Sequence, residues 1–467
     1  MQIKIDSHVH FNPNEIPRQV LARIKTDLTL NNPEYIQAMK YGGYGYTNIE
    51  EKITLYRLDP CSENMILPRG YICEFMKHLR TEGIRPEVVN RTLTLPLVDF
   101  GSQIELRDYQ QPAVEKLVRG IQGGLVAGCG AGKTQVMLEV MARLQQPALW
   151  ITHTKELLNQ VKARAEEVFN NLGPEDVGII ANGKVSIGKK ITFALVQTLS
   201  KQDLSVIKHQ FGAILVDEAH HLAAQTFYQS VDPFPARYRL WCSATPERED
   251  GLTEMVFASG GPVLHTVEAC ELPTVTPKLN IIETGFNFHS SEYAKLINHC
   301  INDPVRNKLI VETVIQEAQG NYSLVLSDRR EHLYKLQEMI REAAPDLSVE
   351  VLEGSMTKKK RAEIMERMLA KQIDVLLATK LAQEGLDIPH LNRLFLVTPK
   401  RAGGALQQEI GRIMRPAEGK ADAVIFDFWD VDSPILKSQM WPRRDVYKKL
   451  GIVWSLNRIQ GAKNKPA

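Results

Sequence analysis

Two short stretches of the sequence place glycines, a lysine and acids where phosphate chemistry needs them. AGCGAGKT at 127–134 follows an apolar run and opens a helical pattern, and AILVDEAHHLAA at 213–224 ends an apolar run in two acids. Glycines allow backbone N–H groups to curl around phosphates, and a helix N-terminus adds partial positive charge there. The first stretch therefore predicts a nucleotide phosphate site.

The residue types in the first stretch assign its roles. Lys133 is expected to reach the terminal phosphates as a mobile cation, and Thr134 to offer its hydroxyl to Mg²⁺. Ala127 stands where the strict pattern has glycine, a tolerable change because that position only packs closely. The glycines expected to form the cradle are Gly128, Gly130 and Gly132.

The acids of the second stretch fit a nucleotide hydrolase better than a metalloprotease. Asp217 is expected to hold Mg²⁺ through water, and Glu218 to polarise the attacking water. A metalloprotease needs two histidines four residues apart on a helix, but His220 and His221 are adjacent. We expect His220 to hydrogen-bond toward the SAT segment, where Ser243 and Thr245 would couple the site to domain movement.

The elements that must position these residues alternate along the chain. From about residue 106, apolar runs of four to six residues alternate with amphipathic helical stretches, and the alternation resumes at about residue 280. This pattern predicts an α/β fold with parallel strands and helical crossovers. Residues 258–279, rich in Gly, Pro and Thr, are expected to link the two sets.

Further motifs extend over residues 106–416 and carry a family resemblance. They are AGCGAGKT, DEAH at 217–220, SAT at 243–245, LRDYQ at 106–110, THTKELLNQ at 152–160, LVQTLS at 195–200, ATKLAQEGLDIP at 378–389 and QQEIGRIMRP at 407–416. The set and its order resemble superfamily 2 helicases and translocases of the DEAH type. The resemblance implies ATP and Mg²⁺ as cofactors, and two tandem RecA-like parallel-sheet lobes preceded by a small α+β accessory domain.

The predicted boundaries follow from the pattern and the resemblance together. They are an accessory, DNA-binding domain over 1–95, an ATP-binding lobe over 96–262, a second lobe over 275–440 and a basic tail over 441–467. Residues 437–467 hold eight basic residues against one acid, a composition that suits phosphates or a solvated helix face. The basic residues are Lys437, Arg443, Arg444, Lys448, Lys449, Arg458, Lys463 and Lys465.

Residues in both lobes take roles from the resemblance. Arg107 and Gln110 match the segment that recognises adenine, and Gly385 and Asp387 could touch ribose or magnesium-bound water. Arg412 and Arg415 are spaced i, i+3, which predicts one helical face, with Gln408 on the same face. An arginine from a facing domain can stabilise charge on the transferring phosphoryl group.

Contacts to a nucleic-acid backbone are also implied by the resemblance. The candidates in the lobes are Thr154, Gln197, Thr198 and Thr379. Hydroxyl and amide groups suit phosphate oxygens, but helix capping is a rival role for each threonine.

The first 95 residues resemble accessory domains of phage branched-DNA helicases of the UvsW type, and SATPEREDG at 243–251 resembles RecG-like and XPB-like motors. Tyr41, Tyr44 and Tyr46 could stack on bases, with Lys40 and Arg69 on phosphates, or they could form a plain hairpin. His8 and His10 leave open a metal hydrolase, whose further ligands the sequence does not supply.

Composition adds only broad constraints. Net charge is +2, and the six cysteines form no CxxC pair, which excludes a zinc knuckle. The chain starts without an apolar signal core and has no apolar run of membrane-spanning length, so we expect a cytoplasmic protein, in the host cytoplasm if phage-encoded. We also expect a monomer without membrane contact.

The sequence therefore predicts an ATP-driven DNA helicase or translocase that acts on forked or branched DNA in phage-type replication, recombination or repair, with other proteins of those processes as possible partners. Translocation would run 3′ to 5′ by family analogy. An RNA helicase with the same ATPase is one alternative. A nucleotide-gated scaffold that binds junctions without moving is another, although Glu218 and Arg412 are residues that a scaffold need not keep.

Overall fold

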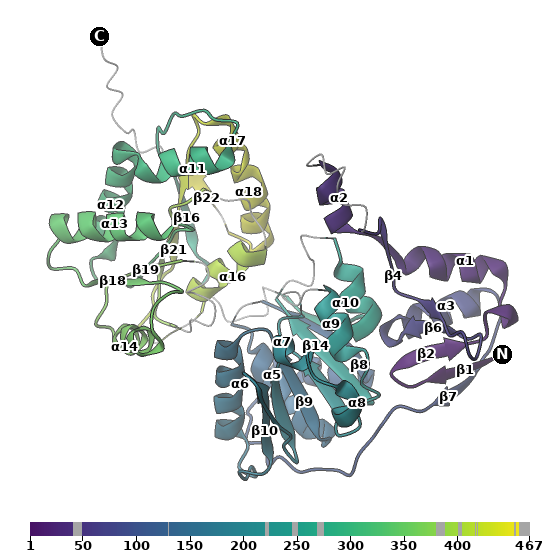
Figure 1. Cartoon of the computed structure of the whole chain (residues 1–467). Helices are drawn as coiled ribbons and strands as arrows, with labels where there is room; N and C mark the ends of the chain where they lie inside the picture. The colour runs from purple at the N-terminus through teal and green to yellow at the C-terminus, as the bar shows by residue number, and fades with distance from the viewer. Residues whose placement is uncertain are drawn as a thin grey trace. The chain divides into compact units, whose positions relative to one another are not determined.

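The strands of the computed structural model form three large sheets and one hairpin, as Figure 1 shows. The chain divides into two units, Met1–Glu271 and Leu272–Ala467. The structure describes residues 1–40, 49–128, 130–219, 224–244, 251–268, 275–379, 388–399, 404–415, 417, 419–452 and 454–456.

The accessory domain is a five-stranded sheet with helices packed on it. The sheet order is β5-β6-β2-β1-β7, in which β1 pairs β7 in parallel and the other neighbours are antiparallel. Its strands are β1 (Gln2–Ile5), β2 (His8–Phe11), β5 (Arg57–Leu58), β6 (Met65–Pro68) and β7 (Glu87–Asn90). The helices are α1 (Arg18–Asp27), α2 (Pro33–Lys40) and α3 (Ile72–Thr81), and the hairpin is β3 (Thr29–Asn31) with β4 (Lys52–Thr54).

The core of the accessory domain continues into the first lobe. Alternate strand residues such as Ile3 and Val9 pack against Val20 and Phe75 from α1 and α3, and the same cluster includes Met255 of the lobe. Since apolar burial is the main favourable term in folding, the accessory domain and the first lobe stabilise each other.

The first lobe is built on an eight-stranded sheet in the order β11-β10-β12-β9-β13-β14-β8-β15. All neighbours are parallel except β10 and β11. The strands are β8 (Gln122–Ala127), β9 (Ala148–Thr152), β10 (Val177–Ala181), β11 (Lys184–Ser186), β12 (Ile191–Leu195), β13 (Ala213–Val216), β14 (Tyr238–Ser243) and β15 (Val263–Val267).

Helices cover the first lobe's sheet on both sides (Figure 1). One face packs on α7 (Val196–Leu199), α8 (Leu204–Ile207), α9 (Ala224–Val231) and α10 (Thr253–Gly260), and α4 (Gln110–Gly120), α5 (Lys133–Leu144) and α6 (Lys155–Val168) also pack on the strands. The central strand β13 is buried along its whole length, as expected of a parallel strand with helices on both faces.

The second lobe has a seven-stranded parallel sheet in the order β18-β19-β17-β20-β21-β16-β22. The strands are β16 (Lys278–Glu283), β17 (Ser323–Leu326), β18 (Val349–Leu352), β19 (Val375–Ala378), β20 (Arg393–Leu396), β21 (Val424–Trp429) and β22 (Trp454–Leu456). Its helices are α11 (Tyr293–Asn302), α12 (Pro304–Ala318), α13 (Arg330–Ala343), α14 (Lys358–Leu369), α16 (Gly404–Ile413), α17 (Pro434–Ser438) and α18 (Met440–Lys449).

Successive strand residues in the second lobe face opposite layers. Leu324 and Leu326 join a cluster with α14, α16 and α18, whereas Val325 joins a cluster with α12 and α13. Two layers of helices on a parallel sheet confirm the predicted α/β fold with two RecA-like lobes.

The elements depart from the predicted boundaries in two places. Strand β15 at 263–267 pairs with β8, so the first lobe extends beyond residue 262. Helix α18 and strand β22 belong to the second lobe's core and sheet, so residues 441–456 are not a tail. No helix within the described ranges is long and apolar enough to cross a bilayer.

Candidate active site

The phosphate turn lies where β8 runs into α5. Gly130 and Gly132 have φ angles of 83° and 73°, a left-handed conformation that glycine adopts at little cost. A Cβ on Gly132 would lie 2.4 Å from Gln110 Nε2, and the Ala131 N–H donates to the Gly128 carbonyl over 3.2 Å. Glycine therefore builds the turn, and the N-terminus of α5 follows it directly.

An acid pair and a lysine lie beside the turn. Lys133 Nζ is 3.2 Å from Glu218 Oε1 and donates to the Ala127 carbonyl over 3.3 Å. Asp217, at the carboxyl end of β13, is 3% exposed and accepts a hydrogen bond from the Cys242 thiol over 3.2 Å. Burial, and then the charge of Glu218, raise the pKa of Asp217 above its ordinary value. The structure thus brings three predicted residues together.

The donor set at this site fits Mg²⁺. Proteins bind Mg²⁺ with one or two carboxylates completed by substrate phosphates and water. Because the pKa of Asp217 is raised, a nearby cation would stabilise its ionised form. Thr134, the second residue of α5, supplies the hydroxyl that the sequence predicted. Mg²⁺ bound here would offset charge on the phosphate oxygens.

Glu218 adopts an unusual backbone conformation. Its φ is 49°, in the left-handed region that non-glycine residues rarely occupy, at a cost of about 1–3 kcal/mol. The conformation directs Glu218 to Lys133 directly after a straight, buried strand. Strain at this position marks the residue predicted to polarise water.

The segment predicted to recognise adenine packs against the turn. Gln110 is 2% exposed, its Nε2 donates to the Ala131 carbonyl over 2.9 Å, and its Oε1 accepts from the Arg107 N–H over 3.0 Å. The Arg107 guanidinium donates to the Tyr109 hydroxyl over 3.1 Å. In this structure Gln110 braces the phosphate turn, and adenine recognition stays a prediction.

The coupling residues are only partly described. Ser243 ends β14 and is fully buried, whereas His220 and Thr245 lie outside the described residues. Sequence reasoning missed Cys242, which touches Asp217 directly. Burial and the nearby Asp217 charge raise the pKa of Cys242, so it remains a thiol donor. The sequence signal for Cys242 was its position directly before Ser243, the first residue of the SAT segment.

The second lobe's arginines lie at the end of α16. Arg412 is half-buried on the helix, but α16 ends at Ile413, so half-buried Arg415 lies in the following turn and the expectation of one helical face is wrong. The Arg415 N–H still donates to the Arg412 carbonyl over 3.5 Å, and Lys420 donates to the Arg415 carbonyl over 2.8 Å. The side chain of Gln408, as well as Gly385 and Asp387, lies outside the described part of the chain.

The backbone-contact candidates sit at element ends. Thr154 caps α6, where its hydroxyl accepts from the Leu157 N–H over 3.3 Å, which is the rival role foreseen for it. Gln197 is exposed on α7 and donates to the His153 carbonyl over 2.9 Å. Thr198 and Thr379 are half-buried, on α7 and directly after β19. Contact with phosphates stays a prediction for all four.

Arg69 corrects one prediction. It is 2% exposed, and its guanidinium donates to Gln122 Oε1 over 2.7 Å and to the Ala236 carbonyl over 2.6 Å. A side chain buried against the first lobe cannot reach a phosphate, so the predicted role of Arg69 in nucleic-acid binding is wrong. The tyrosines at 41–46 and the Lys40 side chain lie outside the described residues.

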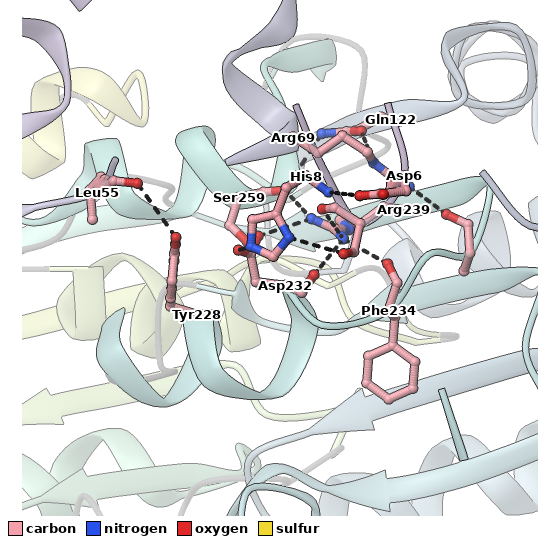
Figure 2. A network of polar contacts seen from close by, with 12 residues as sticks. Asp6, His8, Leu55, Arg69, Gln122, Tyr228, Asp232, Phe234, Arg239 and Ser259 are labelled. Atoms are coloured by element: carbon pink, nitrogen blue, oxygen red, sulfur yellow. Dashed lines mark hydrogen bonds and ion pairs between the residues drawn. The ribbon is translucent and has the colours of Figure 1, made fainter. Parts of the chain in front are cut away.

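Figure 2 shows the junction between the accessory domain and the first lobe, a buried polar cluster that includes His8, Arg69, Asp232 and Arg239. His8 Nε2 lies 2.6 Å from Asp232 Oδ2, and Arg239 Nη1 lies 3.2 Å from Asp232 Oδ1. Arg239 also donates to the carbonyls of Ser259, Phe234 and Ser7 over 2.9, 2.9 and 3.3 Å. The buried charges at the junction are therefore matched by charges and carbonyls.

The junction also accounts for the histidines at the start of the chain. His10 Nε2 contacts Asp6 Oδ1 over 2.8 Å, whereas His8 turns to Asp232, so the two histidines have separate carboxylate partners. Within the described ranges, no group of three or more His, Cys, Asp or Glu could hold a metal ion. The histidines thus have structural partners.

Backbone contact accompanies the polar cluster. Gly70 lies against α10 so closely that a Cβ there would be 2.3 Å from the Phe257 carbonyl oxygen. Helix α10 contributes Ser259 to the cluster, and β14, which ends at Ser243, contributes Arg239. The accessory domain therefore rests on elements that flank the acid pair.

Comparisons with protein families match both lobes. Residues 103–248 match the family described as type III restriction enzyme, res subunit, and residues 305–417 match the helicase conserved C-terminal domain. The chain therefore carries both motor domains of a superfamily 2 helicase.

Relatives match at modest identity over most of the chain. A protein of Acanthamoeba polyphaga mimivirus, provisionally named ATP-dependent RNA helicase L396, is 28% identical to this chain. The match covers 76% of this chain and 70% of the mimivirus protein. The DNA 3'-5' translocase XPB2 of Sulfurisphaera tokodaii is 25% identical, over 72% of this chain and 84% of its own.

The fold is shared with a solved structure of Dbp5. Dbp5 of S. cerevisiae bound to RNA and ADP BeF3 aligns with a TM-score of 0.55 at 15% identity, over 75% of this chain and 89% of that one. T4 UvsW aligns with a TM-score of 0.44 at 18% identity, over 98% of this chain and 99% of that one.

Proposed function

We propose that this chain, which carries the two motor domains of a superfamily 2 helicase, is an ATP-driven DNA helicase or translocase that acts on forked or branched DNA. The observation that carries the ATPase is the placement of Lys133 3.2 Å from Glu218, beside buried Asp217 and at the end of a glycine turn. DNA as the substrate is supported by the name of the related XPB2 translocase.

The lysine and the acid exchange partners in the proposed reaction. Without nucleotide, Lys133 pairs with Glu218. When ATP binds, the Lys133 ammonium turns to the terminal phosphates, which carry more negative charge than one carboxylate. Glu218 is then released to accept a hydrogen bond from the attacking water and to take its proton.

Closure of the second lobe completes the proposed site. Arg412 and Arg415 approach the transferring phosphoryl group and stabilise its charge, an effect worth roughly 10³–10⁵ in rate in related enzymes. Hydrolysis and phosphate release remove the charge that holds the lobes closed. Alternating closure and opening then moves the backbone contacts along one strand, in the 3′ to 5′ direction.

The decisive experiment measures ATP hydrolysis with single-stranded DNA, forked DNA and RNA in parallel, followed by unwinding and fork regression on labelled structures. We expect forked DNA to stimulate most, with movement that requires ATP and fails with a non-hydrolysable analogue. Glu218→Gln serves as the control because it should bind ATP without turnover.

An RNA helicase is the second candidate, since the L396 relative carries that name. Stimulation by RNA alone would overturn the choice of DNA and establish this candidate. Tight junction binding without any movement by the wild-type protein would instead favour a scaffold.

A further inference from the structure

Helix α18 is fixed to the second lobe by one face. Met440 and Tyr447 are 2% and 0% exposed in the lobe's core, and Arg443 is 2% exposed. The Tyr447 hydroxyl donates to Asp427 over 2.6 Å, and Arg443 Nε lies 3.0 Å from the same carboxylate. Because Asp427 is fully buried in β21, these contacts hold the helix in one rotation.

The outer face of α18 carries an aromatic and basic stripe, which we define as Trp441, Arg444 and Lys448. Trp441 is 52% exposed, and the Arg444 guanidinium lies 4.8 Å from the centre of its ring. The spacing i, i+3, i+7 places all three on one side of the helix. Exposed lysines flank the stripe at Lys437 and Lys449.

Exposure alone would not distinguish this surface. Leu97 and Val305 are each 71% exposed, and single apolar residues on a surface are ordinary. Trp441 differs from these residues because its flat, polarisable ring lies among cationic side chains. Asp445 is an exposed acid on the same helix. The core holds α18 through other residues, so the exposed Trp441 ring is not what fixes it.

We propose that the α18 stripe is a stacking platform for bases of single-stranded nucleic acid. Trp441 stacks on a base, Arg444 covers the ring and contacts a phosphate, and Lys448, about 10 Å further along the helix axis, contacts another phosphate. This inference rests on the proposed function but adds a contact to it. Trp441 lies beyond the matched helicase C-terminal domain, which ends at residue 417.

The positive charge around the stripe favours nucleic acid as the ligand over an apolar partner. Lys437, Arg444, Lys448 and Lys449 outnumber Asp445 across α17 and α18. Bases stack on aromatic rings whatever their sequence, while the neighbouring cations match the phosphates. An acidic protein segment would match the cations but would gain little from the flat ring.

The test measures binding of a fluorescein-labelled oligothymidylate and oligouridylate by the full chain, together with quenching of tryptophan fluorescence. We expect Trp441→Ala to weaken binding about 5- to 100-fold, the range associated with one base–aromatic stack. Trp441→Phe should keep most of the affinity and lose most of the quenching. Lys448→Gln should lower the slope of log affinity against log salt by about one.

Tyr334→Ala is the matched control, because Tyr334 is 43% exposed on α13, which packs on the opposite face of the sheet. This variant should bind as the wild type does. Basal ATP hydrolysis, without nucleic acid, should be unchanged in the Trp441 variants and reports that they fold.

The outcomes separate this inference from the proposed function. Wild-type affinity in Trp441→Ala, with a wild-type protein that binds and is stimulated normally, refutes the platform alone. Loss of affinity in Trp441→Phe equal to that in Trp441→Ala also refutes stacking. A wild-type protein that binds neither oligonucleotide, yet captures an acidic peptide through Lys448, would refute both.

Discussion

Two charged clusters in the first unit, the phosphate site and the junction, bury their charges in different ways. At the phosphate site, Lys133 and Glu218 form a pair with a mobile lysine, at 10% and 16% exposure. At the junction, Arg239 and Asp232 are 1% and 2% exposed, and carbonyl groups accept hydrogen bonds from both terminal nitrogens of the arginine. A ligand can separate Lys133 from Glu218, whereas separating Arg239 from Asp232 would leave buried charges poorly compensated.

The difference separates chemistry from architecture. A pair that must exchange partners during turnover has to remain accessible and weakly held. A pair that joins two domains gains from complete desolvation only if every charge is matched. Pairs of opposite charge therefore take two roles, partner exchange in the proposed reaction at one place and domain assembly at the other.

The largest expected effect is on turnover at the phosphate site. Lys133→Ala should lower kcat for ATP hydrolysis by about 10³-fold or more, because the terminal phosphates lose their mobile cation. Its unfolding midpoint in urea should stay near that of the wild type, since the pair is weakly held. Lys184→Ala, at an exposed lysine of the same lobe, is the control. Normal turnover in Lys133→Ala would contradict the proposed difference in role between the phosphate site and the junction.

Next in size is the effect of breaking the junction. Arg239→Leu should lower the free energy of unfolding of the first unit by about 3–5 kcal/mol, because it removes the arginine that pairs with buried Asp232, whose other partners include His8 and the Ser259 hydroxyl. The urea midpoint of the unit measures this loss. Combining Arg239→Leu with Asp232→Leu should recover part of it. A loss below about 1 kcal/mol would mean that the junction is as weakly held as a surface pair.

Gln110 tests whether the phosphate site also contains purely structural contacts. Gln110→Ala should cost about 0.5–1.5 kcal/mol in stability, because the Ala131 carbonyl loses its bond from Gln110 and keeps the longer one from the Tyr109 hydroxyl, and it should raise KM for ATP and GTP by the same factor. Steady-state kinetics with both nucleotides measure this. A rise confined to ATP would show instead that Gln110 recognises adenine.

The smallest expected effect is the pH dependence of the junction. Although burial raises the pKa of Asp232, the hydrogen bond from His8 and the charges of His8 and Arg239 hold it below its ordinary value. A carboxylate with a lowered pKa stabilises the fold above its unfolded pKa of about 3.9, and this contribution is lost as pH falls below that value. Urea midpoints between pH 6 and 3, about the range in which carboxyls titrate, should fall less steeply in Asp232→Asn than in the wild type. Equal slopes of urea midpoint against pH in the two proteins would contradict the stabilising role of ionised Asp232.

Sequence patterns predicted the parallel lobes, and they pointed to Lys133, Asp217 and Glu218 because each motif of the phosphate site is a short continuous stretch. Lys133 follows its glycines directly, and Asp217 ends an apolar strand, so spacing along the chain reports position in space. The left-handed Glu218 was beyond such reasoning, since no glycine or asparagine marks it.

The junction could not be predicted in the same way. His8 and Asp232 are contributed by different domains, and neither residue indicates the other as its partner in the sequence. Arg69 was assigned to phosphates because an arginine near tyrosines in an accessory domain suggests a ligand. Its partners are the Gln122 side chain and backbone carbonyls, some of them more than 150 residues away in sequence, and the sequence does not reveal such contacts. The end of α16 before Arg415, in contrast, had a signal in the sequence, because Pro416 follows and the residue before a proline disfavours the helical conformation.

The close approach at Gly70 has a mechanical consequence. Because the backbone of the accessory domain touches that of α10 without a side chain between them, a shift of α10 cannot be absorbed by a rotating side chain. Helix α10 begins at Thr253, ten residues after Ser243, where the SAT segment starts. A movement of α10 would therefore be transmitted to the N-terminal sheet through the backbone, and cutting the chain near residue 95 would remove this mechanical coupling.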